Sequence, residues 1–139
     1  MAHRKRLGFP GLLLLVAVAG CGGSKLYPVE GKIVYPDGQA AVELAGASVE
    51  FDPVEGKEGA RGQVQADGSF RMGTFQPADG VVPGSYRVCI QPPLPDLDRP
   101  VPSLLPRRYG DFQTSGLQVT IKPEKNPLTL IVERAKPKR

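Results

Sequence analysis

Residues 61–72 read RGQVQADGSFRM, and this stretch carries the strongest local folding signal in the chain. Asp67-Gly68 lies between two short segments in which apolar and polar residues alternate. An Asp-Gly pair in that setting is typical of a two-residue β-hairpin turn, because glycine tolerates the positive φ that the turn requires. The spacing predicts that four side chains around the turn share one buried face: Val64, Ala66, Phe70 and Met72.

Five further segments outside this hairpin alternate between apolar and polar residues in the same way. They are residues 29–35, 47–51, 85–90, 117–121 and 128–132. Turns containing proline or glycine separate them, as at Pro36-Asp37-Gly38 and Pro83-Gly84. Alternation with period two places every second side chain on one face of a strand. With the two hairpin arms, these segments predict an all-β fold, an antiparallel β-sandwich of about seven strands.

Residues 92–115 interrupt this rhythm with six prolines and predict a long, stiffened loop. Within it, charged and aromatic side chains cluster, and we take them as candidate contacts for a ligand or partner. These candidates are Arg107, Arg108, Tyr109, Asp111 and Phe112. The alternative is that Tyr109 and Phe112 only anchor the loop to the domain, and we favour it because buried aromatic rings dominate packing.

The start of the chain predicts export and attachment to a membrane. A basic head, Arg4-Lys5-Arg6, precedes the apolar run 7–19, which is too short for a spanning helix of about 20 residues. The run ends in Val18, Ala19, Gly20 and Cys21, which resembles the lipobox of bacterial lipoproteins. We therefore expect cleavage before Cys21 and modification of its thiol and amino group with fatty acyl chains such as palmitate. More than one chain is needed for durable anchoring.

This signal predicts the domain organisation of the whole chain. Residues 1–20 are the signal peptide, 21–27 the lipidated cysteine and tether, 28–134 the β-sandwich domain, and 135–139 a basic tail. The expected location is the cell envelope, anchored to the cell membrane or the outer membrane. Gly22 follows the cysteine where an aspartate marks inner-membrane retention in some bacteria, so the outer membrane is favoured.

Removing the signal changes the charge balance of the chain. The full sequence has 18 basic and 14 acidic residues, and three of the basic residues would leave with the signal. Four more lie in the tail from residue 134, so residues 21–133 hold 11 basic against 14 acidic residues. The basic isoelectric point therefore gives no support for binding to nucleic acid.

The histidine and cysteine content argues against most catalytic sites. His3 is the only histidine and lies within the expected signal peptide. A mature chain without histidine cannot form Ser-His-Asp or Cys-His pairs or a histidine-ligated metal site. Cys89 would be its only free thiol, and nothing near it in sequence would stabilise a thiolate. We expect a protein that is not an enzyme and holds no cofactor or metal.

Several motifs in order resemble one group of bacterial lipoproteins. They are Val29-x-Gly31-x-Ile33, Gly46-Ala47-x-Val49-x-Phe51, Asp67-Gly68-x-Phe70, Pro83-Gly84-x-Tyr86-x-Val88 and Pro106-x-x-Tyr109. The chain is similar to small lipoproteins whose mature part is a carboxypeptidase-regulatory-like, transthyretin-like β-sandwich. This resemblance covers residues 28–133 and implies an exported seven-stranded domain without assigned activity. The enzymatic branch of the superfold, the hydroxyisourate hydrolases, depends on histidines that the mature chain would lack.

Three functions are compatible with these observations. The leading hypothesis is a non-catalytic, lipid-anchored envelope protein that binds another envelope protein or the cell wall. The second is a carbohydrate-binding module that uses the loop from Arg107 to Phe112, with Tyr27 as a further aromatic. The third is a self-crosslinked, adhesin-like domain joining Lys32 to Asn126 with help from Glu50, although Lys32 and Glu50 are expected to face outward.

Overall fold

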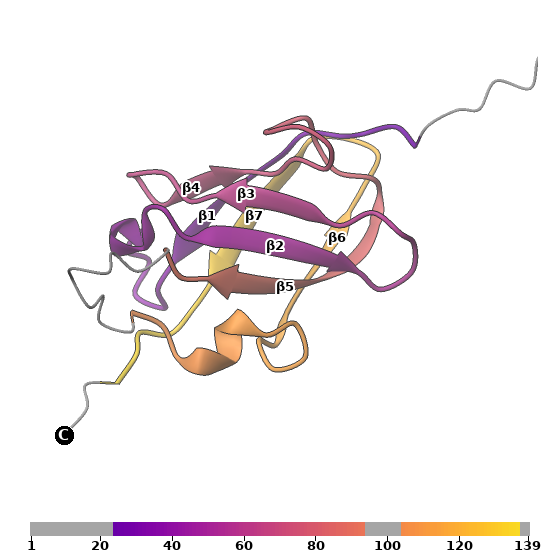
Figure 1. Cartoon of the computed structure of the whole chain (residues 1–139). Helices are drawn as coiled ribbons and strands as arrows, with labels where there is room; N and C mark the ends of the chain where they lie inside the picture. Colours follow the sequence, from indigo (N-terminus) through magenta and orange to yellow (C-terminus); the bar gives the residue numbers. More distant parts are fainter. Residues whose placement is uncertain (1–23, 94–103, 137–139) are drawn as a thin grey trace, which may run out of the picture.

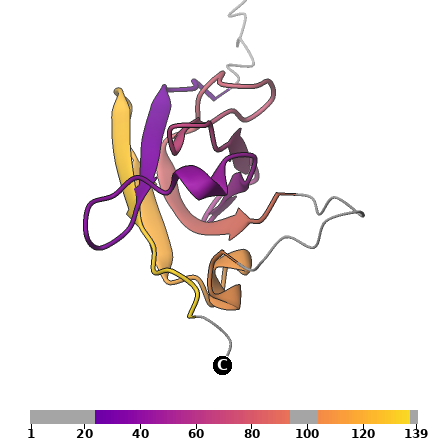
Figure 2. The same ribbon diagram turned by 90° about the vertical axis from the view of Figure 1, so that its left-hand side faces the viewer.

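The computed structural model describes residues 24–93 and 104–136, and over these residues it contains seven strands in two sheets (Figure 1). The sheets pack face to face as two layers (Figure 2), which confirms the predicted all-β sandwich. The expected signal, the lipobox with Cys21, and residues 94–103 of the proline-rich loop lie outside the described residues. No helix in the two described ranges is long and apolar enough to cross a membrane.

The three-stranded sheet has the order β4–β1–β7, and the four-stranded sheet has the order β3–β2–β5–β6. The strands are β1 (Val29–Val34), β2 (Ser48–Pro53), β3 (Ala60–Gln63), β4 (Ser69–Arg71), β5 (Gly84–Gln91), β6 (Leu117–Ile121) and β7 (Asn126–Ile131). Two short 3-10 helices, η1 (Val42–Leu44) and η2 (Arg107–Gly110), lie in the connections.

One strand pair differs from the predicted antiparallel arrangement. β7 runs parallel to β1, in a register from Val29 opposite Asn126 to Val34 opposite Ile131. The chain leaves β6 in one sheet and, after four residues, enters β7 in the other sheet beside the start of β1. Alternation in a sequence shows which face of a strand is buried, but it contains no information about the direction of the neighbouring strand.

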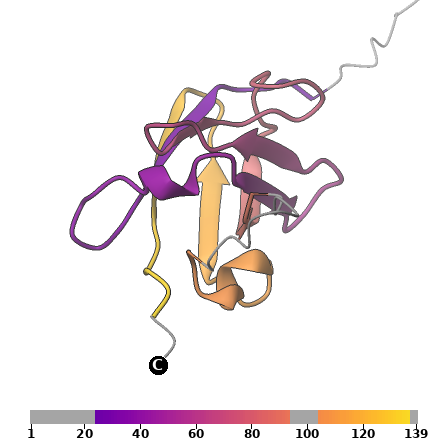
Figure 3. The ribbon, with the colours of Figure 1, turned by 60° about the vertical axis from the view of Figure 1, so that its left-hand side comes forward.

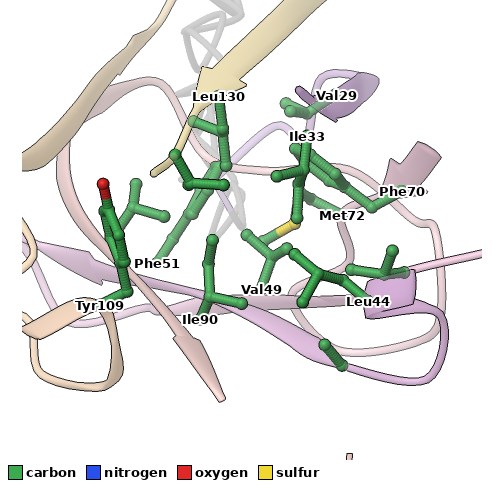
Figure 4. Packing of buried hydrophobic residues seen from close by; sticks show 14 of the residues in the cluster. Val29, Ile33, Leu44, Val49, Phe51, Phe70, Met72, Ile90, Tyr109 and Leu130 are labelled. Atoms are coloured by element: carbon green, nitrogen blue, oxygen red, sulfur yellow. The ribbon is translucent and has the colours of Figure 1, made fainter. Parts of the chain in front are cut away.

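The core lies between the two sheets, as the alternating patterns predict (Figure 4). The buried side chains include Val29, Ile33, Tyr35, Val49, Phe51, Phe70, Met72, Tyr86, Val88, Ile90, Ile121 and Leu130. Leu117 and Val119 of the edge strand β6 are only partly buried. Each fully buried large apolar side chain stabilises the fold by about 1.5–3 kcal/mol relative to exposure.

The chain turns at Asp67-Gly68 as predicted, but the turn has three residues, 66–68, and its two arms belong to different sheets. At the turn, Gly68 has a φ of 82° and the Gln65 N–H donates to the Ser69 carbonyl at 2.7 Å. The arms meet again where Arg61 and Gly73 exchange two backbone hydrogen bonds of 2.9 Å each. β3 otherwise pairs with β2, and β4 pairs with β1, so this hairpin closes one side of the sandwich.

The prediction for Ala66 was wrong, because this residue is exposed at the turn. Val64, Phe70 and Met72 are buried as expected. The chain reverses over Gln65–Gly68, so Ala66 belongs to the turn and no longer follows the alternation of the strand before it.

The described C-terminal segment is held against the loop that follows β1. The Arg134 guanidinium lies 3.7 Å from the centre of the Tyr35 ring and donates to Asp37 and Gln39 at 3.1 Å each. The Tyr35 hydroxyl donates to the Glu43 carboxylate at 2.7 Å. Burial, and then the hydrogen bond and negative charge of Glu43, raise the pKa of Tyr35 to about 12.

Candidate functional site

An open groove of about 1220 Å³ runs along β3, on the side where the two hairpin arms separate. Its floor includes Glu50, Arg61 and Gln63, which point outward from β2 and β3. One wall is the loop 73–78, and Phe112 from the segment after η2 stands on the other side. In Figure 1 and Figure 3 these two segments lie on opposite sides of β2 and β3. A groove larger than the usual 300–1,000 Å³ pocket of small ligands suits an extended ligand.

The wall at residues 73–80 is a tightly hydrogen-bonded loop that exposes an aromatic ring. The Asp79 carboxylate accepts backbone N–H groups of Thr74 at 2.6 Å, Gln76 at 3.0 Å and Phe75 at 3.2 Å. The Thr74 hydroxyl donates to the Gly80 carbonyl at 2.8 Å. The Phe75 side chain is 67% exposed, the largest exposure among the big apolar residues described. The loop therefore presents Phe75 to solvent in a defined position.

Burial opposes ionisation of Asp79, but its three backbone hydrogen bonds outweigh this effect. Together they hold the pKa of Asp79 below its usual value, because they favour the charged carboxylate. The conformation of the loop thus depends on the negative charge of one side chain.

Phe112 is also placed by local hydrogen bonds. The Asp111 carboxylate accepts the Gln113 N–H at 2.7 Å, and the Asp111 carbonyl accepts the Ser115 N–H at 2.9 Å. The Ser115 hydroxyl in turn bonds the Val88 carbonyl in β5, which attaches this turn to the four-stranded sheet. Phe112 is partly exposed at the groove.

Of the five residues predicted as ligand contacts, only Phe112 lines the groove. Tyr109 is 3% exposed and packs into the core, so the alternative that it anchors the loop is confirmed. Its hydroxyl accepts the Glu133 N–H at 3.0 Å and a bond from Arg108 at 2.8 Å. Arg108 also forms an ion pair with Glu133 at 3.1 Å, while Arg107 is exposed in η2.

The groove carries balanced charge. Arg61 lies 3.6 Å from Glu50, and Arg71, also at the groove, lies 3.2 Å from Glu30. Asp67 at the turn accepts hydrogen bonds from the Ser69 hydroxyl and backbone N–H, which lower the pKa of its carboxyl group. The two arginine side chains and Glu30 are largely exposed, whereas the Glu50 side chain is only 25% exposed. Ion pairs with a solvent-exposed partner contribute little to stability, so both arginines remain accessible to a ligand.

Cys89 does not take part in the groove. It lies on β5, faces the segment around η2 and is only 1% exposed. The Gln91 side-chain amide lies beside the thiol and donates to the Gly110 carbonyl at 2.8 Å. Burial, and then the negative charge of Glu50, raise the pKa of the Cys89 thiol. A buried thiol of this kind is a poor nucleophile.

Lys32, Glu50 and Asn126, the residues of the proposed self-crosslink, do not lie together. Lys32 is exposed on the outer face of β1, whereas Glu50 lies on the outer face of β2 in the other sheet. The buried Asn126 amide donates to the Lys122 and Glu124 carbonyls, and its carbonyl oxygen accepts the Lys122 N–H at 2.9 Å. Asn126 therefore closes the turn between β6 and β7.

Most residues of the groove could not be predicted from the sequence. Phe75, Arg61, Arg71 and Gln63 come together only because the hairpin arms separate into two sheets. One usable signal was an aromatic residue inside the turn-rich segment Gly73–Gly80, with an aspartate four residues after it. Among the described residues, no group of three or more His, Cys, Asp and Glu side chains is placed to hold a metal ion.

Comparison with known proteins identifies one similar structure. No protein-family model matches the chain, and no curated protein sequence matches it. The chain is similar to the crystal structure of a DUF3823 family protein from Parabacteroides merdae ATCC 43184, with a TM-score of 0.44 and 17% identity. The match covers 81% of this chain and 48% of that one, so this chain spans about half the length of its neighbour. A likeness of this size says nothing about function.

Proposed function

We propose that this chain is a non-catalytic binding protein of the bacterial cell envelope, anchored by lipid at Cys21, and that its ligand lies in the groove along β3. The observation that carries the proposal is the pairing of Phe75 and Phe112 across a polar floor, each held by an aspartate-centred turn. Exposed aromatic residues in fixed positions are the usual anchors of binding surfaces.

Two features support a role in binding over one in catalysis. The only histidine is His3, which belongs to the proposed signal peptide. The Cys89 thiol is buried and its pKa is raised, so it is not poised for nucleophilic attack. The ordered motifs from Val29 to Tyr109 further suggest that the sandwich is of the carboxypeptidase-regulatory-like, transthyretin-like kind.

Anchoring would hold the domain close to the bilayer. The backbone N–H and C=O of Tyr27 both bond Val81 at 2.9 Å, so the folded domain is held from Tyr27 onward. Five residues lie between Cys21 and Tyr27, and the six steps from one Cα atom to the other span at most about 22 Å in an extended chain. A domain on such a short tether would meet components of its own membrane and the wall layer next to it.

The anchor is tested by replacing Cys21. The Cys21→Ser variant is expected to leave the membrane fraction and to lose the acyl mass found on the wild-type protein. Wild-type protein with an unmodified Cys21 would contradict the anchoring proposal.

The groove is tested by capture from membranes with the anchor intact. Crosslinked wild-type protein is expected to retain defined envelope components, and the Phe75→Ala/Phe112→Ala double variant to lose them. Ile131→Ala is the matched control, because Ile131 is 58% exposed but lies on the outer face of the other sheet. Equal capture by the double variant and the wild type would refute a binding role for the groove.

A further inference from the structure

The groove is built for recognition by side chains and does not offer a free strand edge. β2 covers one edge of β3 from Ala60 to Gln63. On the other edge, Arg61 exchanges two backbone bonds with Gly73, and the Gln63 carbonyl accepts the Gln65 side-chain amide at 3.1 Å. An extended peptide that adds a strand needs a run of free N–H and C=O groups. The blocked edge disfavours a peptide bound in that way.

The charge of the groove argues against a polyanionic ligand. Its two arginines, Arg61 and Arg71, are balanced within the lining by Glu50 and Asp67. Each arginine already forms an ion pair, Arg61 with Glu50 at 3.6 Å and Arg71 with Glu30 at 3.2 Å. Nucleic acids and other polyanions need an excess of positive charge to neutralise them. The balance favours a ligand without net charge.

The polar side chains of the groove are mostly planar groups that can form several hydrogen bonds at once. Gln63, Gln65 and Gln76 offer amide donors and acceptors, and Arg61 and Glu50 add a guanidinium and a carboxylate. Such groups match the closely spaced hydroxyls of a sugar, each of which both donates and accepts. Phe75 and Phe112 supply apolar ring faces for the C–H faces of sugar rings.

We propose that the groove binds a neutral oligosaccharide, with sugar rings packed on Phe75 and Phe112 and hydroxyl groups bonded to Arg61, Glu50 and Gln63. This inference rests on the proposed role of the chain as a binding protein and adds the class of its ligand. It places the sugar outside the turn Arg107–Gly110, where Tyr109 is buried. The volume of the groove, about 1220 Å³, suits several linked sugar units.

The test is calorimetric titration of the full, detergent-solubilised protein with defined hexasaccharides. The neutral probes are maltohexaose, cellohexaose, mannohexaose and chitohexaose, and hexagalacturonate is the anionic comparison. At least one neutral probe is expected to bind saturably at millimolar concentration. Phe75→Ala and Phe112→Ala are each expected to weaken that binding about 10-fold, as for a stacked aromatic anchor. Ile131→Ala should bind like the wild type.

Phe75, Phe112 and Ile131 are all at least partly exposed, so none of the three alanine variants should disturb the core. Thermal unfolding curves that match the wild type will show that the variants are folded. The glycan inference is refuted if no neutral probe binds, if only hexagalacturonate binds, or if the phenylalanine variants bind as tightly as the wild type. If no neutral hexasaccharide binds but the capture of envelope components still depends on Phe75 and Phe112, the groove is a binding site and only the proposed class of ligand is wrong. If capture is also independent of both rings, both proposals fail.

Discussion

Replacing Gly31 by alanine should destabilise the sandwich through a collision with one aromatic ring. Gly31 lies in β1 directly opposite Phe70 of β4, and the Phe70 ring covers it. A methyl group at Gly31 would stand 2.8 Å from both Cε atoms of that ring and closer still to Cζ, whereas ordinary contact begins near 3.4 Å. Phe70 is fully buried, so the ring has little space in which to move.

The expected loss follows from two opposing effects. Overpacking of a core costs about 1–3 kcal/mol. Alanine lowers the entropy of the unfolded chain relative to glycine, which returns about 0.5–1 kcal/mol. Taking the middle of both ranges, Gly31→Ala should lower the free energy of unfolding by about 1 kcal/mol, and by no more than about 2.5 kcal/mol.

Urea denaturation of both single variants and the double variant Gly31→Ala/Phe70→Leu measures this effect. Leucine removes the ring edge that meets the methyl group, so the two changes should couple favourably by about 1 kcal/mol in a double-mutant cycle. A neutral or stabilising Gly31→Ala, or strictly additive changes, would refute the packing of Phe70 over Gly31.

Three further predictions concern single side chains. Asp79→Ala should speed amide hydrogen exchange at Thr74 and Gln76, as measured by NMR, because both N–H groups donate to the Asp79 carboxylate. In the wild type the pKa of Asp79 is lowered, so the protection of these two amides from exchange should persist above about pH 4 and fade as the pH falls below it. If these amides stay protected from exchange both in Asp79→Ala and at low pH, the Asp79 carboxylate does not hold the loop. Tyr35 should titrate near pH 12, and stability should fall between about pH 10 and pH 12 because the unfolded chain ionises first. Glu43→Gln should lower that pKa, and an unchanged ultraviolet titration would count against the bond between them. Cys89 should resist thiol reagents in the native protein and react only on unfolding, so rapid native labelling would disprove its burial.

Much of the fold could be predicted from the sequence, because alternation reports burial directly. Val29, Ile33, Val49, Phe51 and Val88 all occupy the interior that their period-two spacing requires. The pairing partners could not be predicted in this way. The arms around Asp67-Gly68 form a hairpin turn yet enter different sheets, since each arm gains more backbone pairing from β2 or β1 than from the other arm.

The candidate site was harder to predict than the fold, because it is formed by residues distant in sequence. Phe112 lines the groove and is identifiable as an aromatic residue in a long loop, but Tyr109 has the same sequence features and is buried in the core. Phe75 lies in no predicted strand, and its only sequence signal is its place in a turn-rich segment with Asp79 four residues later. Its exposure depends on the backbone hydrogen bonds that Asp79 accepts in this loop. Composition shows that an aromatic ring is present, whereas only tertiary contacts decide whether it faces the core or the solvent.

The most direct test of the groove as the binding site is an intermolecular NOE measurement on the protein saturated with its tightest neutral hexasaccharide. We predict contacts between sugar C–H protons and the ring protons of both Phe75 and Phe112. Contacts to Tyr27 or to the exposed side of the Arg107–Gly110 turn in their place would contradict it, as would the absence of contacts to both rings at saturation.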